Sequence, residues 1–185
     1  GKTSIGTCLA KLLNYNFYDF DDEVEKYYGM PIDYLQKKYI TMDLFRQQAS
    51  IALLHILSKN ESKNAVIALP PSGLMSVYWK IVNESSGTII VLKDSAVNVL
   101  NRIEFFDKDS KLITKNLSEK ESKYYLSEIQ KDIIYYNNSY KKAHYSVSID
   151  GSSILSKLKS IIQKGNDKGE NPLPENEPVK PENIK

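Results

Sequence analysis

The chain contains 185 residues, the size of one domain, and 41% of them are hydrophobic, which is enough for a buried core. It has no run of about 18 apolar residues and therefore no predicted membrane span, and its net charge of +2 without a basic run gives no support for nucleic-acid binding. The single cysteine excludes an internal disulfide and fits a cytoplasmic protein.

The first predicted element is a helix that begins directly at Gly1-Lys2-Thr3. Its apolar face has helical spacing and consists of Ile5, Cys8, Leu9, Leu12 and Leu13. The three opening residues match the end of the P-loop motif G-x-x-x-x-G-K-[ST], which places a lysine and a hydroxyl at the N-terminus of a phosphate-binding helix. The first glycine of the motif and its strand would then precede Gly1. The alternative is an ordinary helix start in which Thr3 or Ser4 lies near the N-cap.

Helices and short apolar runs alternate along the rest of the chain. Strands are predicted at 17–20, 65–69, 88–92 and 145–149. Helices are predicted at 21–28, 31–39, 42–56, about 95–105, 119–136 and 154–164. Ser118 and Glu121 have the spacing of a capping box for the fifth of these helices, and Gly165 is expected to stop the last one.

This alternation predicts an α/β fold of three layers, in which helices cover both faces of a parallel sheet. Ligands of such sheets bind beyond the carboxyl ends of the strands. One domain is expected over 1–164. Residues 165–185 hold four of the seven prolines and few large apolar side chains, so we expect a disordered tail there.

Three aspartates follow the first predicted strand at its carboxyl end. Asp19 and Asp21 are two positions apart, so in an extended backbone both side chains share a face. Phosphoryl transfer needs a metal ion that neutralises the phosphates and a carboxylate that orients the nucleophile. Asp19 and Asp21 are therefore candidates for these two roles. The alternative is that Asp21 or Asp22 only caps the next helix.

Arg46 follows Phe45 in a predicted helix, and its guanidinium could bind the carboxylate of a substrate through two parallel hydrogen bonds. The alternative is a solvated helix residue. The histidines, His55 and His144, are expected to be core or boundary residues and not catalytic ones. Together with the single cysteine they have no spacing typical of a zinc site.

Several of these segments resemble the shikimate kinase family. The matching stretches are GKTSIG at 1–6, LAKLL at 9–13, FYDFD at 17–21, EVE at 23–25 with Gly29, and Phe45-Arg46. Weaker similarity at 100–102, at Tyr140 and around Val147 extends the resemblance over about 1–163. It implies a P-loop fold like that of nucleoside monophosphate kinases, with a lid near 105–117, and it implies ATP and Mg²⁺ as cosubstrate and cofactor.

The resemblance also implies roles for single residues. Lys2 and Asp21 would be the catalytic residues. The nucleotide would contact Gly1, Lys2, Thr3, Ser4 and Arg102, of which Arg102 would lie near adenine. Mg²⁺ would be bound by Thr3 and, through water, by Asp19. The hydroxyls of shikimate would be bound by Asp21 and its carboxylate by Arg46.

The chain departs from the family pattern in the half that would hold the acceptor. Residues 69–73 read Leu-Pro-Pro-Ser-Gly in place of a run of three glycines, which removes two backbone donors. The lid arginine is replaced in the stretch Ser110-Lys111, the second substrate arginine is Tyr136, and residues 47–50 contain no acid. Each lost charge-assisted hydrogen bond is worth about 1.5–3 kcal/mol, so we expect weak or absent shikimate turnover.

Three functions are compatible with the sequence. The first is an ATP-dependent kinase of shikimate or a related small hydroxy acid with a degenerate substrate site. The second is an inactive relative that acts through nucleotide or partner binding, and the third, weaker one is another small-molecule kinase of this fold. A monomer in the cytoplasm is expected, with ATP and a small hydroxy acid as partners and neither nucleic acid nor membrane.

Overall fold

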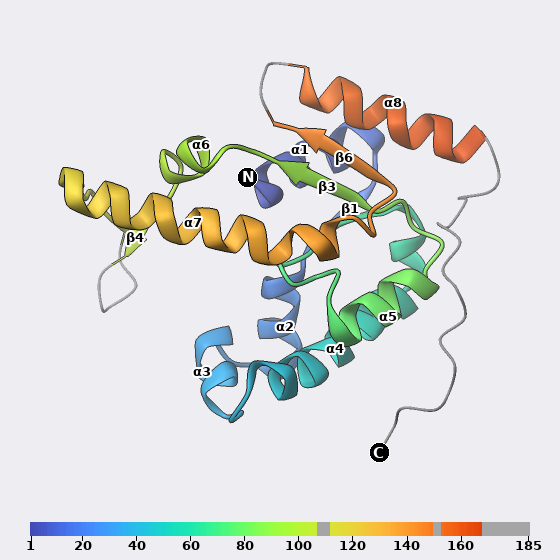
Figure 1. Ribbon diagram of the computed structural model, residues 1–185. Coiled ribbons are helices and arrows are strands. Elements are labelled where there is room, and N and C mark those ends of the chain that lie inside the picture. Colours follow the sequence, from blue (N-terminus) through green and yellow to red (C-terminus); the bar gives the residue numbers. More distant parts are fainter. Residues whose placement is uncertain (107–111, 150–152, 168–185) are drawn as a thin grey trace.

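The computed structural model describes residues 1–106, 112–149 and 153–167 (Figure 1). The helices are α1 (Lys2–Leu13), α2 (Phe20–Tyr28), α3 (Ile32–Lys37), α4 (Met42–Ser58), the 3₁₀ helix η1 (Asn60–Asn64), α5 (Ser76–Glu84), α6 (Ala96–Leu100), α7 (Glu119–Tyr140) and α8 (Ile154–Asp167). The strands are β1 (Asn16–Asp19), β2 (Ala65–Ala68), β3 (Ile90–Lys93), β4 (Phe105–Phe106), β5 (Leu112–Ile113) and β6 (Tyr145–Ser148).

The longer strands form two parallel pairs. β1 pairs with β2 in a register that sets Asp19 beside Ala68, and β3 pairs with β6 so that Lys93 lies beside Ser148. These pairs are separate two-stranded sheets, and β4 and β5 form a third, antiparallel one. The predicted α/β class with parallel strands is thus confirmed, although the described strands do not join in one continuous sheet.

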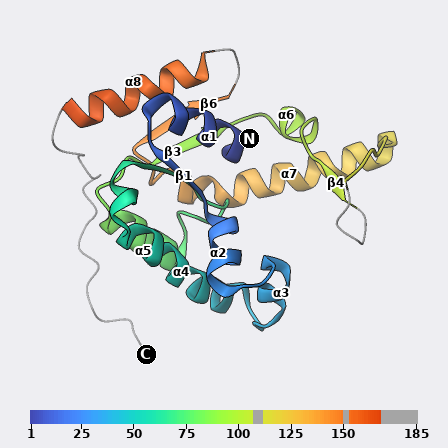
Figure 2. The same cartoon turned by 180° about the vertical axis from the view of Figure 1, so that it is seen from behind.

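Helices cover the parallel strands on two sides. α1 and α8 pack together on one side, and α2, α4, α5 and α7 lie on the other (Figures 1 and 2). The larger cluster of buried side chains joins α2, α4 and α5 around residues such as Phe20, Leu53 and Tyr78, and a smaller one joins Leu9 and Leu158 beneath β6. α1 from one side and α2 from the other both contact β1.

Helix α1 sits close to the first strand because Gly6 carries no side chain. A Cβ atom built at Gly6 would lie 2.7 Å from the ring of Phe17, which leaves no room for a larger residue. Leu9 and Ala10 complete the buried face, whereas Cys8 and Leu12 are exposed. The predicted apolar face was therefore wider than the buried face of this helix, which includes neither Cys8 nor Leu12.

Several helix ends follow the sequence signals. The Ser118 hydroxyl accepts a hydrogen bond from the Glu121 N–H, and the Glu121 carboxylate accepts one from the Ser118 N–H, so the predicted capping box is confirmed. Thr41 caps α4 by accepting a hydrogen bond from the Leu44 N–H at 3.2 Å. Gly29 ends α2 with a φ of 64°, a left-handed conformation that glycine adopts at little cost.

Three helices differ clearly from the prediction. The helix expected at 95–105 ends at Leu100, because the chain turns there and residues 105 and 106 pair with β5, a contact that local periodicity does not reveal. α5 was not predicted at all. α8 continues through Gly165 to Asp167, since one glycine near a helix end costs only about 1 kcal/mol. The rest of the predicted tail, 168–185, and the lid residues Ser110 and Lys111 lie outside the described residues.

None of the described helices is both long and apolar enough to cross a membrane.

His144 links β6 to the segment before β3 and makes stability depend on pH. Its Nδ1 accepts a hydrogen bond from the Ile89 N–H at 3.0 Å, and burial lowers the pKa of His144. The unfolded chain, with an ordinary His pKa near 6.5, then binds the proton more tightly than the folded protein does. We therefore expect the unfolding midpoint in urea to fall as the pH is lowered from about 8 to about 5.

The His144→Asn variant provides the comparison, because its amide oxygen can accept the same hydrogen bond but does not titrate in this range. Its midpoint should depend less on pH than that of the wild type. Equal pH dependence in the two proteins would show that His144 is not the responsible group.

Candidate functional site

The N-terminus of α1 lies beside the carboxyl end of β1, and side chains from both elements meet there. Gly1 is the N-cap of α1 and no side chain caps the helix, so neither Thr3 nor Ser4 has the capping role of the alternative interpretation. Lys2, Thr3 and Ser4 are exposed in the first turn. The N-terminus of α1 thus presents free N–H groups, a lysine ammonium and two hydroxyls. Such groups at a helix N-terminus are suited to bind phosphate.

Asp19 is held by two hydrogen bonds from different elements. The Thr3 hydroxyl donates to Asp19 Oδ2 at 2.7 Å, and the Asp21 N–H donates to Asp19 Oδ1 at 3.2 Å. The second contact makes Asp19 the N-cap of α2, so the alternative interpretation, in which Asp21 or Asp22 caps this helix, is wrong. The side chain of Asp21 is left without a capping role.

The side chain of Asp21 is exposed to solvent, but the surrounding protein raises its pKa. Desolvation by burial is the largest cause that raises the pKa of Asp21, and the neighbouring charge of Asp19 raises it further. The positive charge of Lys2 acts in the opposite direction. A carboxylate with a raised pKa is a better proton acceptor, which suits a group that takes a proton from an attacking hydroxyl.

The side chain of Arg46 on α4 is largely buried, with 12% of it exposed. Its Nη1 bonds to Asp43 at 2.8 Å, one turn earlier in the helix. Its Nε is buried and has no hydrogen-bond partner among the described residues. A buried donor without a partner costs about 1–3 kcal/mol, so the Nε of Arg46 is a donor that an acceptor group of a ligand could satisfy.

The loop before α5 bends sharply. The Gly73 N–H donates to the Pro70 carbonyl at 2.8 Å, and the Met75 N–H donates to the Ser72 carbonyl at 2.9 Å. A Cβ atom at Gly73 would lie 2.6 Å from Leu69 Cβ, so this turn requires glycine. Pro70 and Pro71 offer no N–H groups, and the loop therefore cannot provide the donors that glycines would at those positions.

Arg102 follows α6 and is held by a carboxylate that follows β3. Its guanidinium forms an ion pair with Asp94, which follows β3 and is 5% exposed. Although burial acts against it, hydrogen bonds from Arg102, Asn98 and the Ser95 N–H hold the pKa of Asp94 below its ordinary value.

The sequence analysis did not identify two residues of this site, Asp43 and Asp94. Asp43 pairs with Arg46 at the spacing i, i+3, a relation that could have been read from the sequence once α4 was predicted. Asp94 pairs with Arg102 across a turn, and no local pattern indicated it.

The Thr3 hydroxyl and the Asp19 carboxylate offer adjacent hard oxygen ligands, which fit Mg²⁺. No group of three His, Cys, Asp or Glu side chains that could hold a metal ion occurs among the described residues. Magnesium at nucleotide sites usually has one or two protein ligands and completes its shell with water and phosphate oxygens. The pair is therefore suited to a metal that arrives with a nucleotide.

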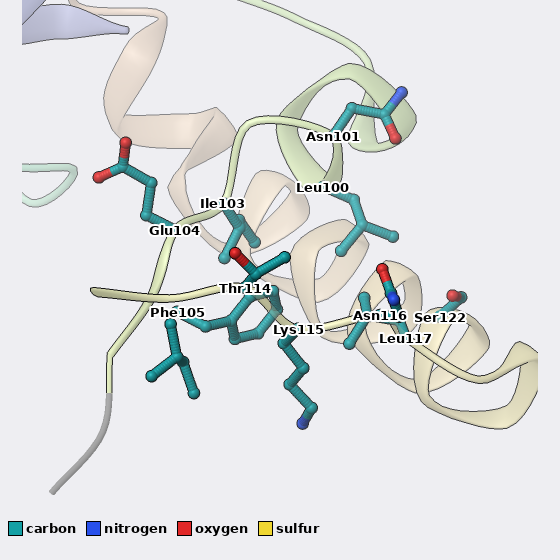
Figure 3. A pocket seen from close by; sticks show the side chains of 11 residues that line it. Leu100, Asn101, Ile103, Glu104, Phe105, Thr114, Lys115, Asn116, Leu117 and Ser122 are labelled. Carbon is teal, nitrogen blue, oxygen red and sulfur yellow. The ribbon is translucent and has the colours of Figure 1, made fainter. Parts of the chain in front are cut away.

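A hollow of about 470 Å³ lies between the end of α6, the β4–β5 pair and the start of α7, beside the segment that carries Arg102 (Figure 3). Leu100, Ile103, Phe105 and Leu117 give it an apolar lining, while Asn101 and Glu104 point outward (Figure 3). None of the predicted site residues lines it. We therefore place the candidate site at the N-terminus of α1, where the charged groups converge.

Comparison with known sequences matches this chain to one protein family. A family model described as shikimate kinase matches residues 1–163. A shikimate kinase of Caldanaerobacter subterraneus subsp. tengcongensis is 27% identical over 163 residues, which are 88% of this chain and 88% of the relative. A shikimate kinase of Clostridium botulinum is 27% identical over 146 residues, which are 78% of each protein.

Solved structures show the same fold. The shikimate kinase from Bacteroides thetaiotaomicron is 18% identical, with a TM-score of 0.69 over 90% of this chain and 92% of the other. The shikimate kinase from Acinetobacter baumannii, solved in complex with shikimate, is 21% identical, with a TM-score of 0.62 over 91% of this chain and 88% of the other.

Proposed function

The chain belongs to the shikimate kinase family, and from this premise we propose that it transfers the γ-phosphoryl group of ATP to a hydroxyl of shikimate. The observation that carries this proposal is the hydrogen bond of 2.7 Å between Thr3 and Asp19, because it joins the N-terminus of α1 to the carboxyl end of β1, which Asp21 follows in the first turn of α2. The family match also favours an enzyme over an inactive relative.

The nucleotide binds at the N-terminus of α1 in this proposal. The backbone N–H groups and the side chains of the first turn, Gly1 to Ser4, surround the phosphates, and Lys2 contributes a mobile point charge. Arg102, held in place by Asp94, lies on the adenine side. Thr3 and Asp19 hold Mg²⁺, which neutralises phosphate charge when it is bound.

The acceptor binds between α2 and α4. Asp21 accepts a hydrogen bond from the reacting hydroxyl and then takes its proton, a role that its raised pKa supports. Arg46 binds the carboxylate through the edge that Asp43 leaves available. We further propose that the protein acts as a monomer in the cytoplasm.

Arg46 allows a test of this arrangement. The Arg46→Lys variant keeps a positive charge but loses the planar geometry that binds a carboxylate with two hydrogen bonds. We expect the KM for shikimate to rise about 10–100-fold, which corresponds to the roughly 1.5–3 kcal/mol of a charge-assisted hydrogen bond, while the KM for ATP stays the same.

The control is the Gln47→Ala variant, which changes the next and exposed position of α4. It should leave both KM values at the wild-type level. An increase in the KM for ATP in Arg46→Lys, or equal effects of the two variants, would show that Arg46 does not bind the acceptor.

A further inference from the structure

The hollow between α6, the β4–β5 pair and α7 is walled mainly by apolar side chains. Five of them come from these elements and the segments that join them: Leu100, Ile103, Phe105, Ile113 and Leu117. Its volume of about 470 Å³ falls within the range of about 300–1,000 Å³ that is usual for small-molecule sites. None of these residues has a role in the proposed function.

A cluster of rings and charges fixes the wall that β4 and β5 provide. The ring of Phe105 meets that of Tyr125 on α7 edge-on, with 5.5 Å between the ring centres. Lys115 Nζ lies 5.4 Å from the centre of the Phe105 ring and 5.7 Å from that of Tyr125. The same Nζ pairs with Glu121 Oε1 at 3.0 Å, and Glu121 also forms the capping box of α7. The hollow therefore exists before a ligand enters, as is usual for small-molecule sites.

The charged side chains of the lining do not offer a free charge to a molecule inside the hollow. The ammonium of Lys115 is engaged by Glu121 and by two rings, and Glu104 points outward (Figure 3). A charged ligand would lose hydration on entry without gaining an opposite charge. Hydroxyl and amide groups complete the lining and can bond to neutral polar atoms, and they belong to Thr114, Asn116 and Ser122.

We infer that this hollow is a second ligand site, separate from the N-terminus of α1, and that it binds small uncharged aromatic molecules with one or two hydrogen-bonding atoms. The apolar walls and the ring of Phe105 favour a flat apolar body. The hydroxyl and amide groups of the lining fix its orientation. The inference goes beyond the proposed function and does not depend on it.

Quinoline is a suitable probe, because it is a flat bicyclic molecule with one ring nitrogen and is uncharged at neutral pH. Titration of the full-length protein, followed by heteronuclear NMR, should shift the backbone amide signals of 100–105 and 113–117 most strongly. The Kd should be about 1 mM or lower, as expected for a ligand of this size. Quinaldate, its carboxylate, and the N-methylquinolinium cation should each bind at least about 10-fold more weakly, since each carries a charge into the hollow.

Ile113 allows the site to be blocked at a position where substitution leaves the core intact. Its side chain is 41% exposed and lines the hollow. Ile113→Trp fills part of the space and Ile113→Glu places a charge there, so each should weaken quinoline binding by about 10-fold or more. The matched controls are Ile133→Trp and Ile133→Glu, because Ile133 is 42% exposed on α7 and does not line the hollow. Both controls should bind quinoline as the wild type does.

Three results would overturn the inference. They are shifts scattered over the surface, binding of either charged analogue as tight as that of quinoline, and equal affinity for quinoline in the Ile113 and Ile133 variants. If Ile113→Trp does not fold, Ile113→Glu decides alone. A protein that binds quinoline in the hollow but does not phosphorylate shikimate would keep this inference and lose the proposed function.

Discussion

Replacing Lys2 by Ala should weaken the binding of ATP by at least about 10-fold, and with it abolish most phosphoryl transfer. Lys2 lies exposed in the first turn of α1, where its ammonium can reach the β- and γ-phosphates that the helix N-terminus attracts. Hydrogen bonds to charged groups are worth about 1.5–3 kcal/mol, and the lost bond has no substitute in Ala. Isothermal titration calorimetry of the full-length protein with Mg-ATP measures the effect.

His55→Ala is the control for this experiment. His55 is exposed on α4 and its ring contacts Tyr27, with 5.4 Å between ring centres. This position is more open than the core or boundary location expected from the sequence. The variant should bind ATP as the wild type does. If both variants lose affinity to the same degree, the assignment of the α1 N-terminus to phosphate is wrong.

Replacing Asp21 by Asn should lower kcat for shikimate by about 10²–10⁴-fold, the usual contribution of a positioned general base. The amide preserves the size of the side chain and can still accept a hydrogen bond, but it cannot take up the proton of the attacking hydroxyl. Asp19, which holds the Thr3 hydroxyl and caps α2, is untouched by this change. The affinity for ATP should therefore stay near the wild-type value.

Asp22→Asn is the matched control, since it removes a carboxylate from the next and exposed position of the same helix. Its kcat should stay within a few fold of wild type. Steady-state kinetics with saturating Mg-ATP would contradict the role of Asp21 if the two variants lost activity equally, or if Asp21→Asn retained most of its kcat.

The nucleotide half of the site could be predicted because its parts are close in sequence. Lys2 and Thr3 open a helix, and Asp19 and Asp21 end the next strand, so periodicity and strand direction already bring them to one edge. The hydrogen bond between Thr3 and Asp19 agrees with that prediction. The sequence did not indicate that Asp19 has a second role as the N-cap of α2.

The acceptor half could not be derived in the same way, because its residues come from elements far apart in the chain. α5 was missed, although Val77, Tyr78, Ile81 and Val82 have helical spacing, since the prolines and glycine before it suggested only a loop. Without α5 there was no reason to place Tyr78 beside Phe20. Tyr136 was noticed only as a departure from a family pattern, because the way α7 docks onto the loop before α5 cannot be read from local periodicity.

The central claim is that this protein transfers phosphate from ATP to shikimate, and phosphorus NMR of the reaction mixture tests it most directly. With Mg-ATP and saturating shikimate, we predict a new phosphate ester that appears together with ADP and requires both substrates. Because Pro70 and Pro71 remove backbone donors and Tyr136 offers no charge, turnover should stay below about 10 s⁻¹, the median for enzymes. Release of ADP without a phosphate ester, or no reaction from a protein that binds both ATP and shikimate, would contradict the account.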